Sequence, residues 1–184
     1  MSVAAVEVYR WTRQEYERMA AAGFFPPEAR VELVEGVVYT MPPQSGPHAT
    51  GIHLMAEALR SAFPRRYLRI QSPLSLGAQS EPEPDLAVVE GSARDYVDAH
   101  PAAALLVVEV ADQSLRHDRG HKLPIYAAAG IPEAWILNLR KKLLDIYRQP
   151  EDGSYRVRTI LRAGDFISPV TSPEVSLPVA DLLP

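Results

Sequence analysis

The chain contains no cysteine among its 184 residues, and this absence excludes several classes of protein at once. A disulfide framework, a thiolate zinc site and a cysteine nucleophile all require the thiol group. No run approaches the ~18–20 consecutive apolar residues that span a bilayer. Met1–Arg10 also lacks the basic and apolar regions of a signal peptide. We therefore expect a cytoplasmic protein without a membrane partner.

Three nucleotide-binding and hydrolase motifs are absent as well. The sequence has no G-x-x-x-x-G-K-[ST] loop, no G-x-G-x-x-G fingerprint and no G-x-S-x-G turn. A P-loop enzyme, a dinucleotide-binding enzyme and a serine hydrolase therefore have no support in the sequence.

The overall composition is that of one ordinary globular domain. Hydrophobic residues make up 47% of the chain and charged residues 23%, close to the averages for folded proteins. We expect a single domain over residues 1–184, with segments 1–10 and 170–184 at its periphery. The net charge of -4 and the pI of about 5.7 do not favour a nucleic-acid partner. Clustered arginines and lysines lessen this objection: Arg60–Arg69, Arg116–Lys122 and Arg140–Lys142.

Apolar periodicity and helix end signals predict an alternation of helices and strands. Thr12 and Glu15 form a capping-box pattern, which opens the first helix. The strand at 104–110 is almost continuously apolar, as expected of a strand buried on both faces, so it should lie centrally. The predicted helices cover 12–22, 52–63 and 122–129. The predicted strands cover 31–41 as a hairpin, 67–71, 85–89, 104–110, 134–139, 143–148 and 155–161.

Two carboxylates stand at the ends of apolar strands. Asp85 opens the predicted strand at 85–89, and Glu109 closes the one at 104–110. If these strands are neighbours and their directions bring the two acids to the same edge of the sheet, both acids could bind one hard cation through oxygen, as Mg²⁺ prefers. The alternative is that each acid marks only the point where a strand meets solvent.

A lysine and a glutamate are further candidates for this site. Lys122 begins a helix whose apolar side must face the sheet. Its ammonium could there neutralise the negative charge of a phosphorane-like transition state or orient a water. A lysine at a helix start is otherwise usually solvated. Glu32 and Glu35 flank Leu33 and Val34, and strand alternation turns only one of them inward. Glu32 shares its side with Val34, so Glu35 is better assigned to the turn.

Histidines raise a separate possibility. His117 and His121 have the i, i+4 spacing of a zinc protease H-E-x-x-H helix, with aspartate in place of glutamate. Gly120 and Pro124 weaken the helix that such a site needs. His48 and His53 are five positions apart, which does not place them on one helical face.

Several segments together resemble a bacterial family, the restriction-endonuclease-like proteins of the PD-(D/E)XK nuclease superfamily. The resemblance runs from about Trp11 to the C-terminal tail, and its specificity lies in the order of the segments. They are Val31-Glu32-Leu33-Val34-Glu35-Gly36, Pro84-Asp85-Leu86-Ala87-Val88-Val89, Val107-Val108-Glu109-Val110, Asp118-Arg119-Gly120-His121-Lys122-Leu123-Pro124-Ile125-Tyr126 and Ala129-Gly130-Ile131-Pro132-Glu133-Ala134-Trp135.

The resemblance implies an α/β restriction-endonuclease-like core, with a mixed central β-sheet flanked by helices. It implies Mg²⁺, with Mn²⁺ as a substitute, held by Asp85, Glu109 and the carbonyl of Val110. The superfamily's lysine normally stands two residues after the second acid, where this chain has Ala111, and Lys122 on the following helix is the matching residue. Glu32 matches an acidic residue of the N-terminal region.

The function implied is a metal-dependent endonuclease that hydrolyses phosphodiester bonds in DNA. Because homo-oligomers usually have closed symmetry, a homodimer is the expected assembly. The alternative is a catalytically inactive nuclease fold that serves as a binding or assembly module, which the acidic pI and the displaced lysine favour.

Overall fold

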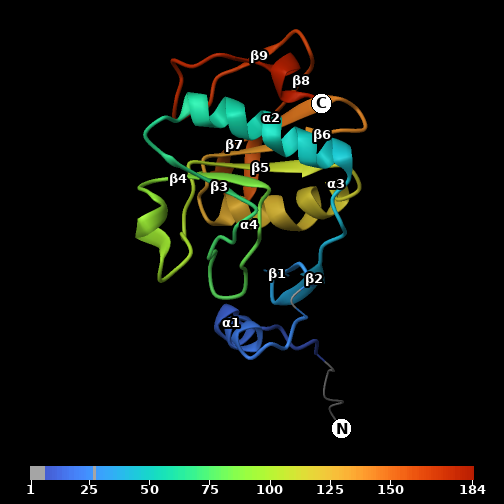
Figure 1. Ribbon diagram of the computed structural model, residues 1–184, viewed down its shortest axis with the longest axis vertical. Coiled ribbons are helices and arrows are strands. Elements are labelled where there is room, and N and C mark those ends of the chain that lie inside the picture. Colours follow the sequence, from blue (N-terminus) through green and yellow to red (C-terminus); the bar gives the residue numbers. More distant parts are fainter. Residues whose placement is uncertain (1–6, 27) are drawn as a thin grey trace.

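The computed structural model describes residues 7–26 and 28–184, and its centre is a six-stranded mixed sheet. In spatial order the strands are β3 (Tyr67–Ile70), β4 (Leu86–Val89), β5 (Leu106–Ala111), β6 (Glu133–Asn138), β7 (Leu143–Glu151) and β8 (Ser154–Leu161). Helix α2 (Gly46–Ala62) covers one face of the sheet and α4 (Leu123–Ala128) covers the other (Figure 1). The predicted α/β class and the mixed sheet flanked by helices are confirmed.

The N-terminal elements lie on the α4 side of the sheet (Figure 1). Helix α1 (Arg13–Ala21) has the predicted capping box, in which Thr12 N–H donates to Glu15 Oε2 at 2.8 Å and Glu15 N–H to Thr12 Oγ1 at 3.3 Å. Strands β1 (Val31–Val34) and β2 (Val37–Thr40) form the predicted hairpin. Its turn residues Glu35 and Gly36 both have positive φ, which suits a tight hairpin turn.

Strand β5 is central and buried along its whole length, as its apolar run predicts. It pairs antiparallel with β4, with Leu86 opposite Val108, so the same register continued by one residue sets Asp85 opposite Glu109. It pairs in parallel with β6. A parallel pair requires a crossover connection, and the helical segment that ends in α4 supplies it.

Alternation along β5 divides its side chains between two hydrophobic clusters. Val108 and Val110 belong to the cluster under α2, and Val107 and Ala111 belong to the cluster under α4. Glu109 therefore faces the α4 side, because successive strand residues point to opposite faces.

The helix predicted over 122–129 corresponds to α4 (Leu123–Ala128), and it continues a helical run that begins earlier. A continuous helical run contains α3 (Leu115–His117), a π-helical turn (Asp118–Lys122) and α4. The Ser114 hydroxyl donates to the Asp118 carboxylate at 2.7 Å, and both Asp118 and Lys122 are buried. Tertiary packing thus outweighs the low helix propensity of Gly120.

The C-terminal segment contains β9 (Phe166–Ile167), β10 (Leu177–Pro178) and a 3₁₀ helix (Val179–Leu182), and a further 3₁₀ turn covers Ala93–Tyr96. We expected residues 170–184 at the periphery. The segment lies on the outer side of α2 (Figure 1), and its Val179 and Leu182 are fully buried in the cluster under α2.

Residues 7–10 are exposed, and the first six residues of the segment expected at the other periphery lie outside the described residues. Among the helices that the structure describes, none has the length and apolar content needed to cross a bilayer.

Gly51 lets α2 approach the centre of the sheet. A Cβ added at this position would lie 3.0 Å from Val110 Cγ1 and 3.3 Å from Leu137 Cδ2. Gly51→Val should therefore lower the free energy of unfolding by about 1–3 kcal/mol through overpacking, measured by urea denaturation.

Gly46→Val is the matched control, since a Cβ at Gly46 meets nothing within 4 Å. Its effect should stay within about 0.5 kcal/mol, as for most surface substitutions. Equal losses in the two variants would contradict the close approach of α2 to β5.

Candidate active site

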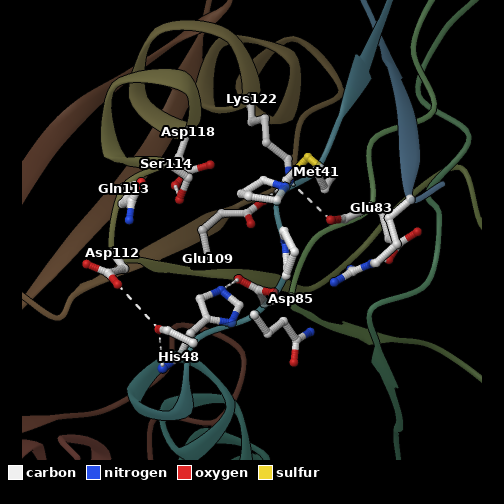
Figure 2. A pocket seen from close by; sticks show the side chains of 15 residues that line it. Met41, His48, Glu83, Asp85, Glu109, Asp112, Gln113, Ser114, Asp118 and Lys122 are labelled. Carbon is white, nitrogen blue, oxygen red and sulfur yellow. Dashed lines mark hydrogen bonds and ion pairs between the residues drawn. The ribbon is translucent and has the colours of Figure 1, made fainter. Parts of the chain in front are cut away.

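A cavity of about 110 Å³ opens at the start of β4 and the end of β5, beneath the helical run. Asp85, Glu109 and Lys122, which the sequence places far apart, all line it. Figure 2 shows Lys122 approaching from the helical run, Glu109 lying centrally, and Asp85 beside His48 on the opposite side. The structure therefore brings the three predicted residues to one place.

The ammonium of Lys122 is buried and is bonded to three acceptors. Its Nζ lies 2.9 Å from Glu109 Oε1 and 3.2 Å from Glu32 Oε2, and it donates to the Glu83 carbonyl at 3.1 Å. Burial alone would lower the pKa of Lys122, but the carboxylates of Glu109 and Glu32 raise it above its ordinary value. The lysine is therefore charged throughout the physiological pH range.

Glu32 is fully occupied by hydrogen-bond partners. Its Oε2 accepts from Glu83 N–H at 2.9 Å as well as from Lys122, and its Oε1 lies 3.1 Å from His117 Nε2. Burial opposes ionisation, yet Lys122 and His117 lower the pKa of Glu32 to about 2. Glu32 therefore holds the lysine in position, and Glu35 stays exposed at the turn, as alternation predicts.

Glu109 lies at the centre of the cavity and is only 4% exposed. Its Oε1 accepts from Lys122 and from the Tyr126 hydroxyl at 2.5 Å, whereas Oε2 makes no hydrogen bond to the residues that the structure describes. Burial raises the pKa of Glu109 well above its ordinary value, although Lys122 lowers it, and the nearby carboxylates of Asp118 and Asp85 raise it further. Several acidic side chains thus lie close together around the ammonium of Lys122.

Asp85 is held at the edge of the same cavity. Its Oδ2 accepts from Val110 N–H at 2.8 Å and lies 3.3 Å from His48 Nε2, and its Oδ1 accepts from Gln71 Nε2 at 3.2 Å. Burial opposes ionisation, but the hydrogen bond from His48 lowers the pKa of Asp85. Val110 thus contributes its N–H to Asp85, and a role for its carbonyl as a metal ligand stays a prediction.

Sequence reasoning missed two residues of this site. His48, on the first turn of α2, was assigned no role because its spacing to His53 gives no shared helical face. Asp118 was considered only as part of a zinc motif, although it lines the cavity and is 1% exposed. Its i, i+4 spacing to Lys122 was the available signal, since this spacing puts both side chains on one side of a helix.

The positions of His117 and His121 do not support the zinc protease alternative. His117 Nε2 lies against Glu32, whereas His121 Nδ1 lies 3.8 Å from Glu35. The two imidazoles thus face different carboxylates.

The donor set suits a hard cation in an open site. No three His, Asp or Glu side chains within residues 7–26 and 28–184 are already placed to hold an ion. Mg²⁺ does not require such a cage, because it usually takes one or two carboxylates and completes its shell with water and substrate phosphate. Asp85 and Glu109 provide two carboxyl groups, and the free Oε2 of Glu109, with Asp118 on the same cavity wall, fits a divalent ion.

Comparisons with known proteins show the family and the fold of the chain. Residues 13–180 match the Uma2 family, described as "Putative restriction endonuclease", and the chain belongs to this family. The fold resembles that of a crystal structure described as "a putative nuclease belonging to DUF820 from Anabaena variabilis", with a TM-score of 0.76 and 16% identity. That similarity covers 93% of this chain and 96% of the other. Among curated proteins the chain has no match.

The Glu32 contacts predict a pH-dependent loss of stability. Removing one partner of a buried ion pair costs about 3–5 kcal/mol, so Glu32→Gln should lower the free energy of unfolding by about 3 kcal/mol at pH 7. The folded-state pKa of about 2 lies below the ordinary 4.5, so this stabilisation is complete above about pH 4.5 and disappears as the pH falls toward 2. The difference between wild type and variant should shrink over that interval in urea denaturation.

Glu90→Gln provides the control, because Glu90 is exposed and pairs only with the exposed Arg66. It should change stability little at any pH. A Glu32→Gln difference that stays constant from pH 7 to pH 3 would contradict the buried pairing.

Proposed function

We propose that the protein is a divalent-metal-dependent endonuclease that hydrolyses phosphodiester bonds in DNA. The observation that carries the proposal is the convergence of Asp85, Glu109 and the buried Lys122 on one cavity, in a chain of a restriction-endonuclease family. Fold alone does not determine function, so the argument depends on these side chains.

Asp85, Glu109 and the carbonyl of Val110 would hold Mg²⁺ or Mn²⁺. When bound, such an ion polarises the scissile phosphate and lowers the pKa of an attacking water. The cavity of about 110 Å³ has room for a phosphodiester group or a few waters, since a water occupies ~30 Å³ in the liquid.

Lys122 supplies a fixed positive charge beside the reacting phosphate. Its three N–H donors are taken by Glu109, Glu32 and the Glu83 carbonyl, so it stabilises developing negative charge electrostatically rather than by donating to a water. The pairing with Glu32 fixes the position of this charge before substrate arrives. Preorganisation of this kind costs no rearrangement during the reaction.

His48 and Tyr126 orient the two acids. His48 keeps Asp85 ionised and turned toward the Val110 amide, and the Tyr126 hydroxyl holds one oxygen of Glu109 so that the other is free. Both act through the carboxylates and are therefore positioning residues.

Purified protein should nick or cut plasmid or single-stranded DNA when Mg²⁺ or Mn²⁺ is added, and a chelator should stop the reaction. Asp85→Ala, Glu109→Gln and Lys122→Met should each lower the initial rate by about 100-fold or more, the scale seen when one electrostatic group is removed from an active site. The measurement is the rate of product formation on gels, with circular dichroism to check folding.

Lys141→Ala is the control, because Lys141 is exposed in the turn between β6 and β7. It should cleave at nearly the wild-type rate. Unchanged cleavage by both Asp85→Ala and Lys122→Met would refute the site. Wild-type protein that neither cleaves nor binds Mn²⁺ at millimolar concentration would instead be an inactive binding or assembly module.

A further inference from the structure

Asp118 is a buried carboxyl group without a salt-bridge partner among the described residues. Burial raises its pKa above the ordinary value, although the nearby ammonium of Lys122 lowers it. It is 1% exposed and lines the same cavity as Asp85 and Glu109. Lys122 lies four residues later on the same helical run, yet its ammonium pairs with Glu109 and Glu32. Within the described part of the chain, Asp118 takes part in no ion pair.

Only one side of the Asp118 carboxylate is occupied. Its Oδ2 accepts from the Ser114 hydroxyl at 2.7 Å, and Oδ1 makes no hydrogen bond to any residue that the structure describes. Figure 2 shows Asp118 and Ser114 next to each other on the helical run, above Glu109. One oxygen is therefore held in place and the other is available to the cavity.

A purely structural role does not explain this charge. The contact with Ser114 would also form with an asparagine, which carries no charge and has a smaller desolvation cost on burial. Asp112, another acid of the cavity wall, shows the usual solution, since its Oδ1 lies 3.2 Å from Arg140 Nε and its side chain is 31% exposed. Asp118 has neither a salt-bridge partner among the described residues nor contact with solvent.

The local backbone also keeps Asp118 inside the cavity. It begins the π-helical turn that ends at Lys122, and both residues are buried. Single π-helical turns occur frequently at functional sites, where they change which side chains a helix turns inward.

We propose that Asp118 is a third acidic residue of the ion site, whose Oδ1 accepts a hydrogen bond from a water bound to the divalent ion. The inference rests on the function proposed above. A water-mediated contact fits because no three acids of the described residues are placed to touch one ion, and because Mg²⁺ usually keeps several waters. Ser114 fixes the orientation of the carboxylate.

The test is calorimetric titration of metal-free protein with Mn²⁺. Residues that orient the ligands of a metal typically change its affinity by 10–100-fold, so Asp118→Asn should raise the Mn²⁺ Kd by about 10-fold or more. Asp112→Asn is the matched control and should leave the Kd within about twofold, because Arg140 already offsets that charge. Ser114→Ala should raise the Kd about threefold or more, since the carboxylate loses its orientation.

A second readout separates this role from a structural one. Asp118→Asn removes an uncompensated buried charge, so the Tm of the metal-free protein should stay the same or rise. The increase in Tm on adding Mn²⁺ should become smaller, because stabilisation by a ligand follows its affinity. A structural Asp118 would instead give a lower metal-free Tm and an unchanged Kd.

The outcomes distinguish the two proposals. If wild type binds Mn²⁺, Asp85→Ala abolishes binding and Asp118→Asn leaves the Kd within twofold, only the role of Asp118 is overturned. If wild type does not bind Mn²⁺, the proposed function fails and the role of Asp118 fails with it. If Asp118→Asn does not fold, Ser114→Ala decides, and an unchanged Kd overturns the inference.

Discussion

The buried ammonium of Lys122 is the interaction on which the site depends. It joins the N-terminal hairpin through Glu32, the central strand through Glu109, and the loop before β4 through the Glu83 carbonyl. Without that charge, Glu32 and Glu109 would be two buried carboxylates facing each other. The same contacts that hold three segments together therefore also set the electrostatics of the cavity.

The pKa values of the two acids in contact with Lys122 are shifted in opposite directions because their surroundings differ. Glu32 has donors on both oxygens, which lowers its pKa, whereas burial raises the pKa of Glu109, whose second oxygen lacks a donor. One carboxylate is thus a permanent counter-ion. The other can accept a further positive partner, and this difference supports assigning positioning to Glu32 and ion binding to Glu109.

Much of the fold could be predicted from the sequence, because its strongest signals are local. The capping box of Thr12, the turn at Glu35 and Gly36, and the apolar run of β5 each depend on residues close together in the chain. The placement of Asp85 and Glu109 at strand ends followed from the same pattern. The resemblance supplied Lys122 and Glu32, which spacing alone left uncertain.

The missed features depend on contacts that no local pattern records. Asp118 lies in a stretch whose Gly120 opposes helix formation, and the packing of Leu115, Leu123 and Tyr126 against the sheet offsets that preference. His48 contacts Asp85 because the first turn of α2 packs beside that residue, with 3.3 Å between His48 Nε2 and Asp85 Oδ2. This contact joins distant parts of the chain, so no local sequence pattern predicts it. The burial of Val179 and Leu182 under α2 was not predicted, because no local pattern shows which segment covers the outer side of that helix.

The distance along the chain between Glu32 and Lys122 also determines when the cavity can form during synthesis. A nascent chain that has left the ribosome as far as β5 already contains Glu32, Asp85 and Glu109 but lacks the ammonium that offsets their repulsion. Glu32 on the hairpin then lacks the lysine that offsets the cost of burying its carboxylate. The contacts of Lys122 that join Glu32 and Glu109 therefore require the helical run that follows β5.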